Sequence, residues 1–219
     1  MSFETSTRYF SPDGRLYQVE YAQHASDQGG LACLSIYNDK IYVFYDNKQI
    51  NNLQILDDRI VYLRNNMFLL FSGVKPDCYN LIDSCASKIL SHKLECDEDL
   101  TVEELTGFIS EFKQWYTVSR TFRPLGLKTV VFGFENGKPK IYVVEADGNF
   151  AEYEKCAVGS KADKIYDKFE DVDEFSALKA LITVTPKDAK NIKGFKIENN
   201  NNIKEIDTKI IHDKINNFE

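Results

Sequence analysis

The first regular pattern of hydrophobic and polar residues lies close to the N-terminus of the chain. Ser11-Pro12-Asp13-Gly14 predicts a tight turn, because proline favours the second position of a β-turn, and serine and glycine suit the first and fourth. From Arg15 to Gln28 there is no glycine or proline, and apolar residues recur at helical spacing on two sides. One stripe comprises Leu16, Val19 and Ala22, and the other comprises Tyr17, Tyr21 and Ala25.

Two apolar stripes on one helix allow two interpretations. In the first, the helix packs on its own domain and its tyrosines keep their hydroxyl groups in water. In the second, the helix lies between its own domain and a neighbouring chain. The spacing alone favours the first interpretation.

Beyond this helix, short β-rich runs occur in pairs and longer helical patterns are grouped between them. The pattern predicts strands at 31–37, 40–45, 59–63, 67–72, 127–134, 140–145, 194–198 and 203–206, and helices at 75–92, 102–120, 162–169, 175–183 and around Ile210 and Ile215. Antiparallel hairpins with grouped helices indicate an α/β (α+β) fold with two stacked sheets and a helix layer on each outer face. We expect one domain over residues 1–219, with 1–14 as tail and turn, 15–28 as the N-terminal helix and 29–219 as the sandwich.

Composition and charge narrow the class of partner. The 219 residues are 43% hydrophobic and carry a formal net charge of -7, which opposes binding to nucleic acid. No apolar run approaches the roughly 18 residues that span a bilayer, and the first residues, MSFETSTRY, do not resemble a signal or transit peptide. We therefore expect protein partners, and neither nucleic acid nor a membrane.

The cysteines, histidines and acidic residues do not form a recognisable reactive site. The five cysteines are widely spaced without a CxxC pair, which indicates reduced thiols in the cytoplasm or nucleus. His24, His92 and His212 lack the spacing of metal ligands, so no metal or cofactor is expected. A run of acidic residues favours a solvated turn before a helix over an acid/base or calcium site. It comprises Glu95, Asp97, Glu98, Asp99, Glu103 and Glu104.

FSPDGRLYQVEYA at 10–22 closely resembles the N-terminal signature of alpha-type subunits of the proteasome core particle. Further similar segments follow in the family's order: DQGGL at 27–31, SG at 72–73, YTVSRTFRPLG at 116–126 and EYEKCAVGSKAD at 152–163. The DQGGL and RPLG segments are most similar to those of the family member in the alpha-one position. The resemblance implies the four-layer αββα sandwich of N-terminal-nucleophile hydrolases. It also implies an N-terminal helix that contacts neighbours in a heteroheptameric ring, which favours the second interpretation of the two stripes.

The resemblance also implies a subunit without catalytic residues of its own. Related beta-type subunits cleave peptides with an N-terminal threonine, but Gly29-Gly30-Leu31-Ala32 stands at that point here. Asp46 and Arg59 fall near the positions of the beta-type catalytic aspartate and lysine, and without a nucleophile we expect them to have lost that role. The alternative is an active threonine-type hydrolase, and a third possibility is a lone sandwich that binds partners outside any ring.

Several residues match positions that the family uses for assembly and docking. Phe3, Glu4, Pro12 and Tyr21 match a cluster formed when the entry gate opens, and Gly14, Leu16 and Tyr17 complete the implied ring interface. Thr5 replaces an arginine of that motif and only two residues precede Phe3, so we do not expect this tail to block the gate.

A second implied surface receives the C-terminal tails of activators. Arg59, with Gly29 beside it, aligns with a pocket where a lysine pairs with the tail carboxylate. A local ion pair of Arg59 with Asp57 or Asp58 is an equal alternative. The implied function is to build the outer ring, the substrate entrance and the docking surface in ubiquitin-dependent protein degradation. The implied partners are other alpha-type and beta-type subunits, the tails of a regulatory particle or activator, and unfolded polypeptide passing the gate.

Overall fold

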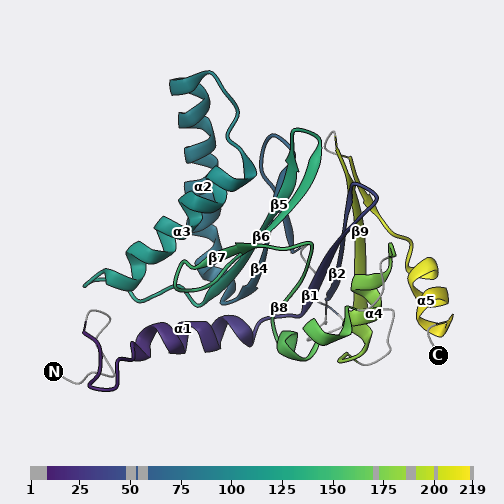
Figure 1. Ribbon diagram of the computed structural model, residues 1–219, viewed down its shortest axis with the longest axis horizontal. Helices are drawn as coiled ribbons and strands as arrows, with labels where there is room; N and C mark the ends of the chain where they lie inside the picture. The colour runs from purple at the N-terminus through teal and green to yellow at the C-terminus, as the bar shows by residue number, and fades with distance from the viewer. Residues whose placement is uncertain are drawn as a thin grey trace.

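The computed structural model describes residues 9–47, 53, 59–169, 173–185, 191–199 and 202–217. Two antiparallel sheets face each other, and helices cover the outer face of each sheet (Figure 1). This arrangement confirms the predicted four-layer αββα sandwich.

Each sheet combines strands that are distant in the sequence. The first sheet has the order β10-β9-β2-β1-β8 and comprises β1 (Ala32–Tyr37), β2 (Lys40–Asp46), β8 (Lys155–Val158), β9 (Ile192–Glu198) and β10 (Asn202–Glu205). The second has the order β3-β4-β5-β6-β7 and comprises β3 (Ile60–Tyr62), β4 (Met67–Gly73), β5 (Leu127–Glu135), β6 (Lys138–Val144) and β7 (Phe150–Glu152). The chain therefore passes from the first sheet to the second and back.

The alternation of side chains along the strands separates the core into layers. In β4, Phe68 and Leu70 point into the space between the sheets, whereas Met67 and Leu69 point toward the outer helices. Phe68 lies opposite Phe132 of β5, and their rings stack with centroids 5.6 Å apart. A shift of one residue in this register would move each set to the wrong layer.

Two pairs of helices bury the outer faces. The helices α2 (Lys75–Cys96) and α3 (Val102–Val118) cover the second sheet, while α4 (Ser176–Ile182) and α5 (Thr208–Asn217) cover the first. None of the helices that the structure describes is both long and apolar enough to cross a membrane.

The N-terminal helix α1 (Tyr17–Asp27) lies across one end of the sandwich, below the ends of the strands in Figure 1. It begins two residues later than the pattern predicted, since Leu16 is its N-cap residue. Val19, Ala22 and Ser26 are buried against the main body, and α1 contacts both β4 and β5. Val19 and Ala22 of the first predicted stripe are therefore buried by the chain itself, and Leu16 is half-buried.

Two details of the predicted pattern were wrong. The predicted helix at 162–169 is instead a pair of short 3₁₀ turns, Ala162–Lys164 and Tyr166–Lys168. Lys161 before them takes a left-handed conformation, and the main-chain hydrogen bonds that follow span three residues and not four. The strands β7 and β8 were not predicted, since β7 is exposed and only three residues long, so it has no apolar alternation.

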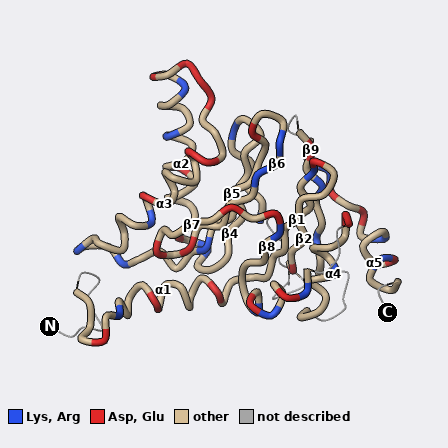
Figure 2. The backbone as a smooth tube through the Cα atoms, viewed as in Figure 1, with Lys and Arg blue, Asp and Glu red and all other residues tan. Residues whose placement is uncertain are grey.

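The acidic run lies in the connection between α2 and α3, at the top of Figure 2, and leads into the first turn of α3. Thr101 is the N-cap residue. Its side-chain oxygen accepts a hydrogen bond from the Glu104 amide at 3.1 Å, and the Glu104 carboxylate accepts one from the Thr101 amide at 2.9 Å. These contacts confirm a solvated acidic turn before a helix.

Replacement of Thr101 by alanine is expected to lower the free energy of unfolding by about 1 kcal/mol, because both reciprocal cap bonds at the start of α3 are lost or weakened. Denaturant unfolding of Thr101→Ala and wild type measures the change. Thr101→Ser keeps the acceptor oxygen and serves as control, so an equal loss in both variants would contradict the cap argument.

Candidate functional site

The N-terminal turn has the predicted geometry. The Gly14 amide donates to the Ser11 carbonyl at 2.8 Å, and Gly14 has a φ of +75°, a value that glycine adopts without strain. The Arg15 amide donates to the Ser11 hydroxyl oxygen at 3.0 Å, and the Ser11 amide donates back to the Arg15 carbonyl at 2.9 Å. The turn, with Pro12 exposed in it, therefore fixes the direction in which the chain enters α1.

The second stripe of α1 is only partly covered: Tyr21 is exposed, and Tyr17 and Ala25 are half-buried. Tyr21 is 53% exposed and its ring stacks on Tyr17 with centroids 6.4 Å apart. The guanidinium of Arg15 lies 5.0 Å from the centre of the Tyr17 ring and pairs with Glu20. Exposed contiguous aromatic residues of this kind mark a surface that contacts another molecule.

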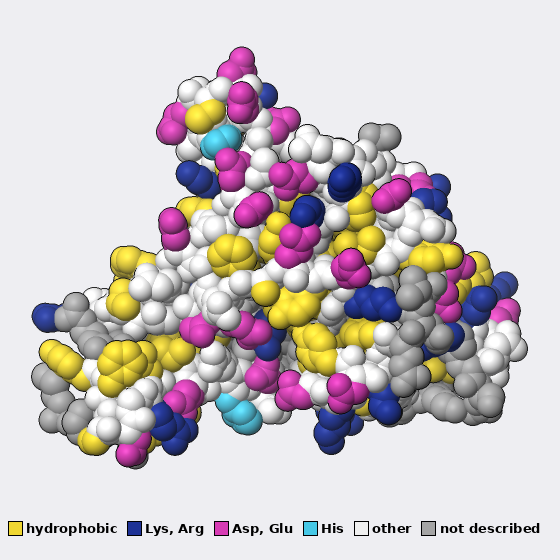
Figure 3. Space-filling view, viewed as in Figure 1, with side chains coloured by type: hydrophobic (Ala, Val, Ile, Leu, Met, Phe, Trp, Pro, Cys, Tyr) yellow, Lys and Arg dark blue, Asp and Glu magenta, His cyan; other side chains and the backbone are white. Residues whose placement is uncertain are grey.

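More hydrophobic side chains extend this surface toward the chain end. Figure 3 shows them gathered over the N-terminal part of α1, at the lower left of the view. Tyr9 is 58% exposed and Phe10 is 64% exposed. Phe3 and Glu4, which the sequence pattern assigned to the same region, lie outside the described residues.

At the opposite end of α1, about 16 Å away for a helix of 11 residues, glycines from several segments meet. We call Gly29, Gly30, Gly73, Gly126 and Gly159 the glycine junction. A Cβ atom on Gly29 would lie 2.1 Å from the Gly73 amide nitrogen, and one on Gly159 would lie 2.2 Å from the Gly30 carbonyl oxygen. At Gly29, Gly73 and Gly159 the backbones approach too closely for any side chain, whereas a Cβ on Gly30 or Gly126 would first meet a neighbouring side chain at 3.0 Å.

Hydrogen bonds hold the glycine junction together. The Ser72 hydroxyl donates to the Ser26 carbonyl at 2.9 Å, which joins β4 to the last turn of α1. The Ser160 amide donates to the Gly29 carbonyl at 2.9 Å, and the Val74 amide donates to the Gly126 carbonyl at the same distance. The end of α1 is therefore joined to β4 through the Ser72 hydroxyl, and Gly29 just after α1 is joined to Ser160, which follows β8, through a main-chain bond.

Arg59 fills the space beside the glycine junction. Its Nη1 donates to the Leu31 carbonyl at 2.9 Å, and its Nη2 donates to the carbonyls of Gly30 at 2.7 Å and Phe71 at 3.0 Å. The guanidinium also lies 5.3 Å from the centre of the Tyr45 ring. Burial lowers the pKa of Arg59 to about 10, so the side chain stays protonated at neutral pH.

The glycine junction and Arg59 lack the groups that a hydrolase active site needs. Gly29 and Gly30 have no side-chain nucleophile, and the protonated Arg59 cannot accept a proton from one. Asp46 ends β2 close enough to influence the pKa of Arg59. Asp57 and Asp58, the alternative partners of Arg59, lie outside the described residues.

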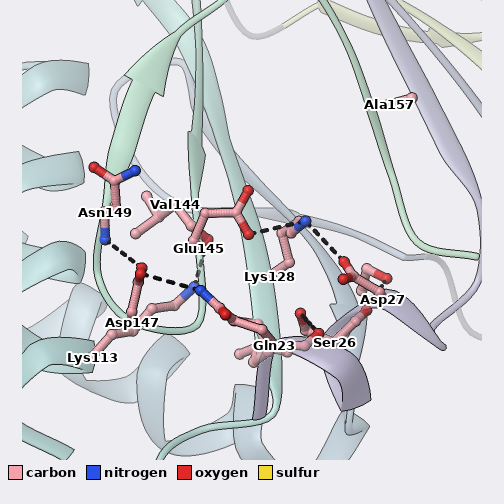
Figure 4. A network of polar contacts seen from close by, with 12 residues as sticks. Gln23, Ser26, Asp27, Lys113, Lys128, Val144, Glu145, Asp147, Asn149 and Ala157 are labelled. Atoms are coloured by element: carbon pink, nitrogen blue, oxygen red, sulfur yellow. Dashed lines mark hydrogen bonds and ion pairs between the residues drawn. The ribbon is translucent and has the colours of Figure 1, made fainter. Parts of the chain in front are cut away.

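A network of charged side chains joins α1 to the second sheet (Figure 4). The Lys128 ammonium lies 2.9 Å from carboxylate oxygens of both Asp27 and Glu145, and Gln23 donates to Asp147 at 3.2 Å. Burial lowers the pKa of Lys128, but its hydrogen bonds to the two carboxylates outweigh this effect and the pKa is raised. No local pattern indicated this network, because it depends on three separate segments.

The remaining reactive residues are scattered. All five cysteines are free, and only Cys96 is exposed. Within the described ranges, no three histidine, cysteine, aspartate or glutamate side chains gather in a group that could hold a metal ion. The candidate sites are therefore the exposed stripe of α1 at one end of the helix and the glycine junction with Arg59 at the other.

Comparison with known proteins gives the same family for the whole chain. A family model described as "Proteasome subunit" matches residues 29–184, and a second model, which describes the N-terminal signature of A-type proteasome subunits, matches residues 3–25. The alpha type-7-1 proteasome subunit of Drosophila melanogaster is 31% identical over 99% of this chain and 93% of its own length. The alpha type-8 subunit of Mus musculus is 32% identical over 87% of this chain and 82% of its own.

A plant protein is similar to this chain at about the same level of identity as these animal proteins. The alpha type-7 proteasome subunit of Cicer arietinum is 30% identical over 94% of this chain and 87% of its own length. The N-terminal signature covers the turn and the first two turns of α1, and the longer match covers most strands of both sheets. The chain therefore belongs to the proteasome subunit family and carries the N-terminal signature of its alpha-type members.

Proposed function

We propose that this chain is a non-catalytic alpha-ring subunit of the proteasome core particle. The observation that carries the proposal is the N-terminal helix: the body of the chain buries Val19, Ala22 and Ser26, while Tyr17 and Tyr21 form an outer stripe that another subunit can cover. The subunit builds the outer ring, the substrate entrance and part of the docking surface for regulators in ubiquitin-dependent protein degradation. Its native partners are other alpha-type and beta-type subunits.

The proposal is tested by the mass of the endogenous assembly. The tagged chain is purified from its own cells under native conditions, and the subunits that accompany it are identified by mass spectrometry. We expect a particle of high mass that contains other alpha-type and beta-type subunits. A stable monomer in the extract would contradict ring assembly.

The absence of catalysis is part of the same proposal. It is supported by the glycine junction, where close main-chain packing occupies the point at which related subunits have a nucleophile. The intact mass of the purified chain should show no cleavage before an internal threonine. An internal N-terminal threonine, together with peptidase activity of the isolated chain, would favour the hydrolase alternative.

Tyr21→Ala is expected to reduce incorporation into the ring several-fold and to change the unfolding free energy of the chain by less than about 0.5 kcal/mol, because the Tyr21 side chain is exposed in the free chain. The matched control is Val19→Ala, which removes buried methyl groups and should cost about 1 to 2 kcal/mol. Thermal unfolding and competitive assembly measure the two effects. Equal stability losses with unchanged incorporation would argue against a neighbour on this stripe.

We further propose the alpha-one position within the ring, on the similarity of the DQGGL and RPLG segments. The relatives compared above are named alpha type-7 and alpha type-8, which favours a different position. Cross-linking of the assembled particle identifies both neighbours of this chain. Neighbours other than those of an alpha-one subunit would rule out the assignment.

We also propose that Arg59 and Gly29 belong to a pocket for activator tails, which the Arg59 variants described in the Discussion test.

We propose in addition that the particle acts in the cytoplasm and nucleus. The free cysteines support a reducing compartment. Cell fractionation tests the location, and the presence of the chain in a secretory fraction alone would refute it.

A further inference from the structure

Lys113 is a charged residue in the core of the sandwich. It is fully buried, with 0% of its surface exposed, on the face of α3 that packs against the second sheet. Its Nζ donates to the carbonyls of Leu127 and Val144, both at 2.8 Å. Among the described residues its hydrogen-bond partners are these two carbonyls, and no carboxylate forms an ion pair with it.

The two carbonyls match the neutral form of this amine. A neutral amine has two N–H groups, and both are used by Leu127 and Val144. The ammonium form has three N–H groups, and the third has no acceptor among the described residues. Burial without a paired charge also disfavours the ammonium form. Burial lowers the pKa of Lys113 to about 7, although Glu145 and Asp147 act in the opposite direction.

The turn after Val144 connects this buried amine to the N-terminal helix. On one side, α3 holds the turn, since the Ser110 hydroxyl bonds to the Gly148 carbonyl and Lys113 bonds to Val144. On the other side, the turn holds α1 (Figure 4): Asp147 accepts from Gln23, and Glu145 pairs with the Lys128 that also pairs with Asp27.

We propose that proton uptake by Lys113 loosens the C-terminal half of α1 from this turn, so that the seating of the N-terminal helix depends on pH near neutrality. The ammonium attracts Glu145 and Asp147 inward and away from the α1 contacts. It repels Lys128, which bridges to Asp27. Both effects favour release of α1 when the amine is protonated.

The other titratable and charged groups around Lys113 come from each neighbouring element. The groups that act on Lys113 itself are Lys128 of β5, Glu145 and Asp147 of the turn, and Cys85 of α2. On α1, which the turn holds, the titratable groups nearest these contacts are Asp27, paired with Lys128, and His24, next to Gln23. Burial raises the pKa of Cys85 to about 12, so this thiol stays neutral throughout the range considered. His24 is exposed on α1, the helix whose protection is measured, so the test includes a variant that lacks this side chain.

The direction of the pH dependence of α1 docking follows from the lowered pKa of Lys113. Above pH 7 the docked state holds fewer protons than the released state that the ammonium form favours, so docking of α1 strengthens as pH rises. Below about pH 6 Lys113 is protonated in both states and the dependence ends. A single proton allows at most about a tenfold change per pH unit.

The test measures amide hydrogen exchange of α1 in the full chain from pH 6 to 8.5, with each rate divided by its intrinsic value. Protection of the amides at residues 23–28 should rise by up to about tenfold between pH 7 and 8.5 in wild type. It should be independent of pH in Lys113→Met. His24→Gln and Lys88→Met, which replaces an exposed lysine of α2, should keep the wild-type slope. The same slope in Lys113→Met and wild type would overturn the proposal.

If Lys113→Met does not fold, carbon NMR of the lysine Cε atoms in wild type decides the question. The Lys113 resonance should titrate between pH 6 and 8, and Asp147→Asn should shift its midpoint to lower pH, because an attractive carboxylate is lost. A midpoint above pH 9, or a midpoint unchanged by Asp147→Asn, would refute the mechanism. These measurements are made on the single chain, so their outcome does not depend on whether the chain assembles into a ring.

Discussion

Replacement of Gly29 by alanine is expected to lower the unfolding free energy by about 3 kcal/mol, one of the largest effects of a single methyl group in this chain. The new Cβ would lie 2.1 Å from the Gly73 amide nitrogen and 2.3 Å from the Ser72 hydroxyl oxygen. The closest clash is with a main-chain atom, so a change of rotamer cannot relieve it. The Ser72 bond to the Ser26 carbonyl would be disturbed at the same time.

Two other glycines separate this clash from the general effect of adding a side chain. Gly107 lies inside α3, and a Cβ added there would have no other atom within 4 Å, so Gly107→Ala should stabilise the chain by about 0.5 to 1 kcal/mol. Gly14 also has open space but has a φ of +75°, so Gly14→Ala should cost about 1 kcal/mol. Denaturant unfolding gives the three values, and a cost at Gly29 no larger than that at Gly14 would contradict tight packing at the junction.

The sequence predicted the layers of the fold because its strong signals are local. Met67 to Ser72 alternates between two apolar layers, and the Asn65-Asn66 turn before it adopts positive φ angles. The strands β7 and β8 lacked such a signal. Lys155–Val158 contains four residues, and it is held mainly by pairing with β1, which lies more than a hundred residues earlier.

From local residue patterns the candidate site was predictable only at one end of α1, and at the other end Arg59 and Gly29 were indicated by the family resemblance alone. The turn, the helix and the two stripes follow from residues close together in the chain. The glycine junction requires residues 29, 73, 126 and 159 to meet, and only the folded sheets bring them together. The DQGGL, SG and RPLG segments supported the family resemblance, but no spacing rule indicated that their glycines touch.

Lys113 shows a signal that could have been used. It lies four residues after Ile109 and eight after Leu105, so it occupies the buried stripe of α3. The aromatic residues Phe108, Phe112 and Tyr116 lie to one side of this stripe, where their rings are half-buried and contact one another. A lysine on a buried stripe predicts a specific polar partner, although its identity depends on the tertiary fold.

Arg59→Ala is expected to lower the unfolding free energy by about 3 kcal/mol, because three carbonyl groups lose a charged donor. The Leu31 carbonyl keeps a second partner, the Asp46 amide at 3.1 Å. Removal of its bond to Arg59 should therefore cost less stability than removal of the other two bonds. Arg59→Lys retains the charge and some of the bonds, and should cost about half as much. A cost below about 1 kcal/mol in Arg59→Ala would mean that the three bonds contribute little to the fold.

The same variants test the proposed docking of activator tails. Both N–H groups of Nη2 are used by Gly30 and Phe71, so a tail carboxylate can approach Arg59 only through Nη1 or Nε, unless one of these bonds breaks. The contact is therefore a single charge-assisted bond, and Arg59→Ala should weaken docking by about 1 to 3 kcal/mol per pocket. Arg59→Lys should keep most of the affinity, since its ammonium also donates to a carboxylate.

Titration of assembled particles with activator, at concentrations near the dissociation constant, measures these affinities and avoids the masking effect of several tails binding together. Equal affinity in wild type and Arg59→Ala would assign Arg59 to the fold alone.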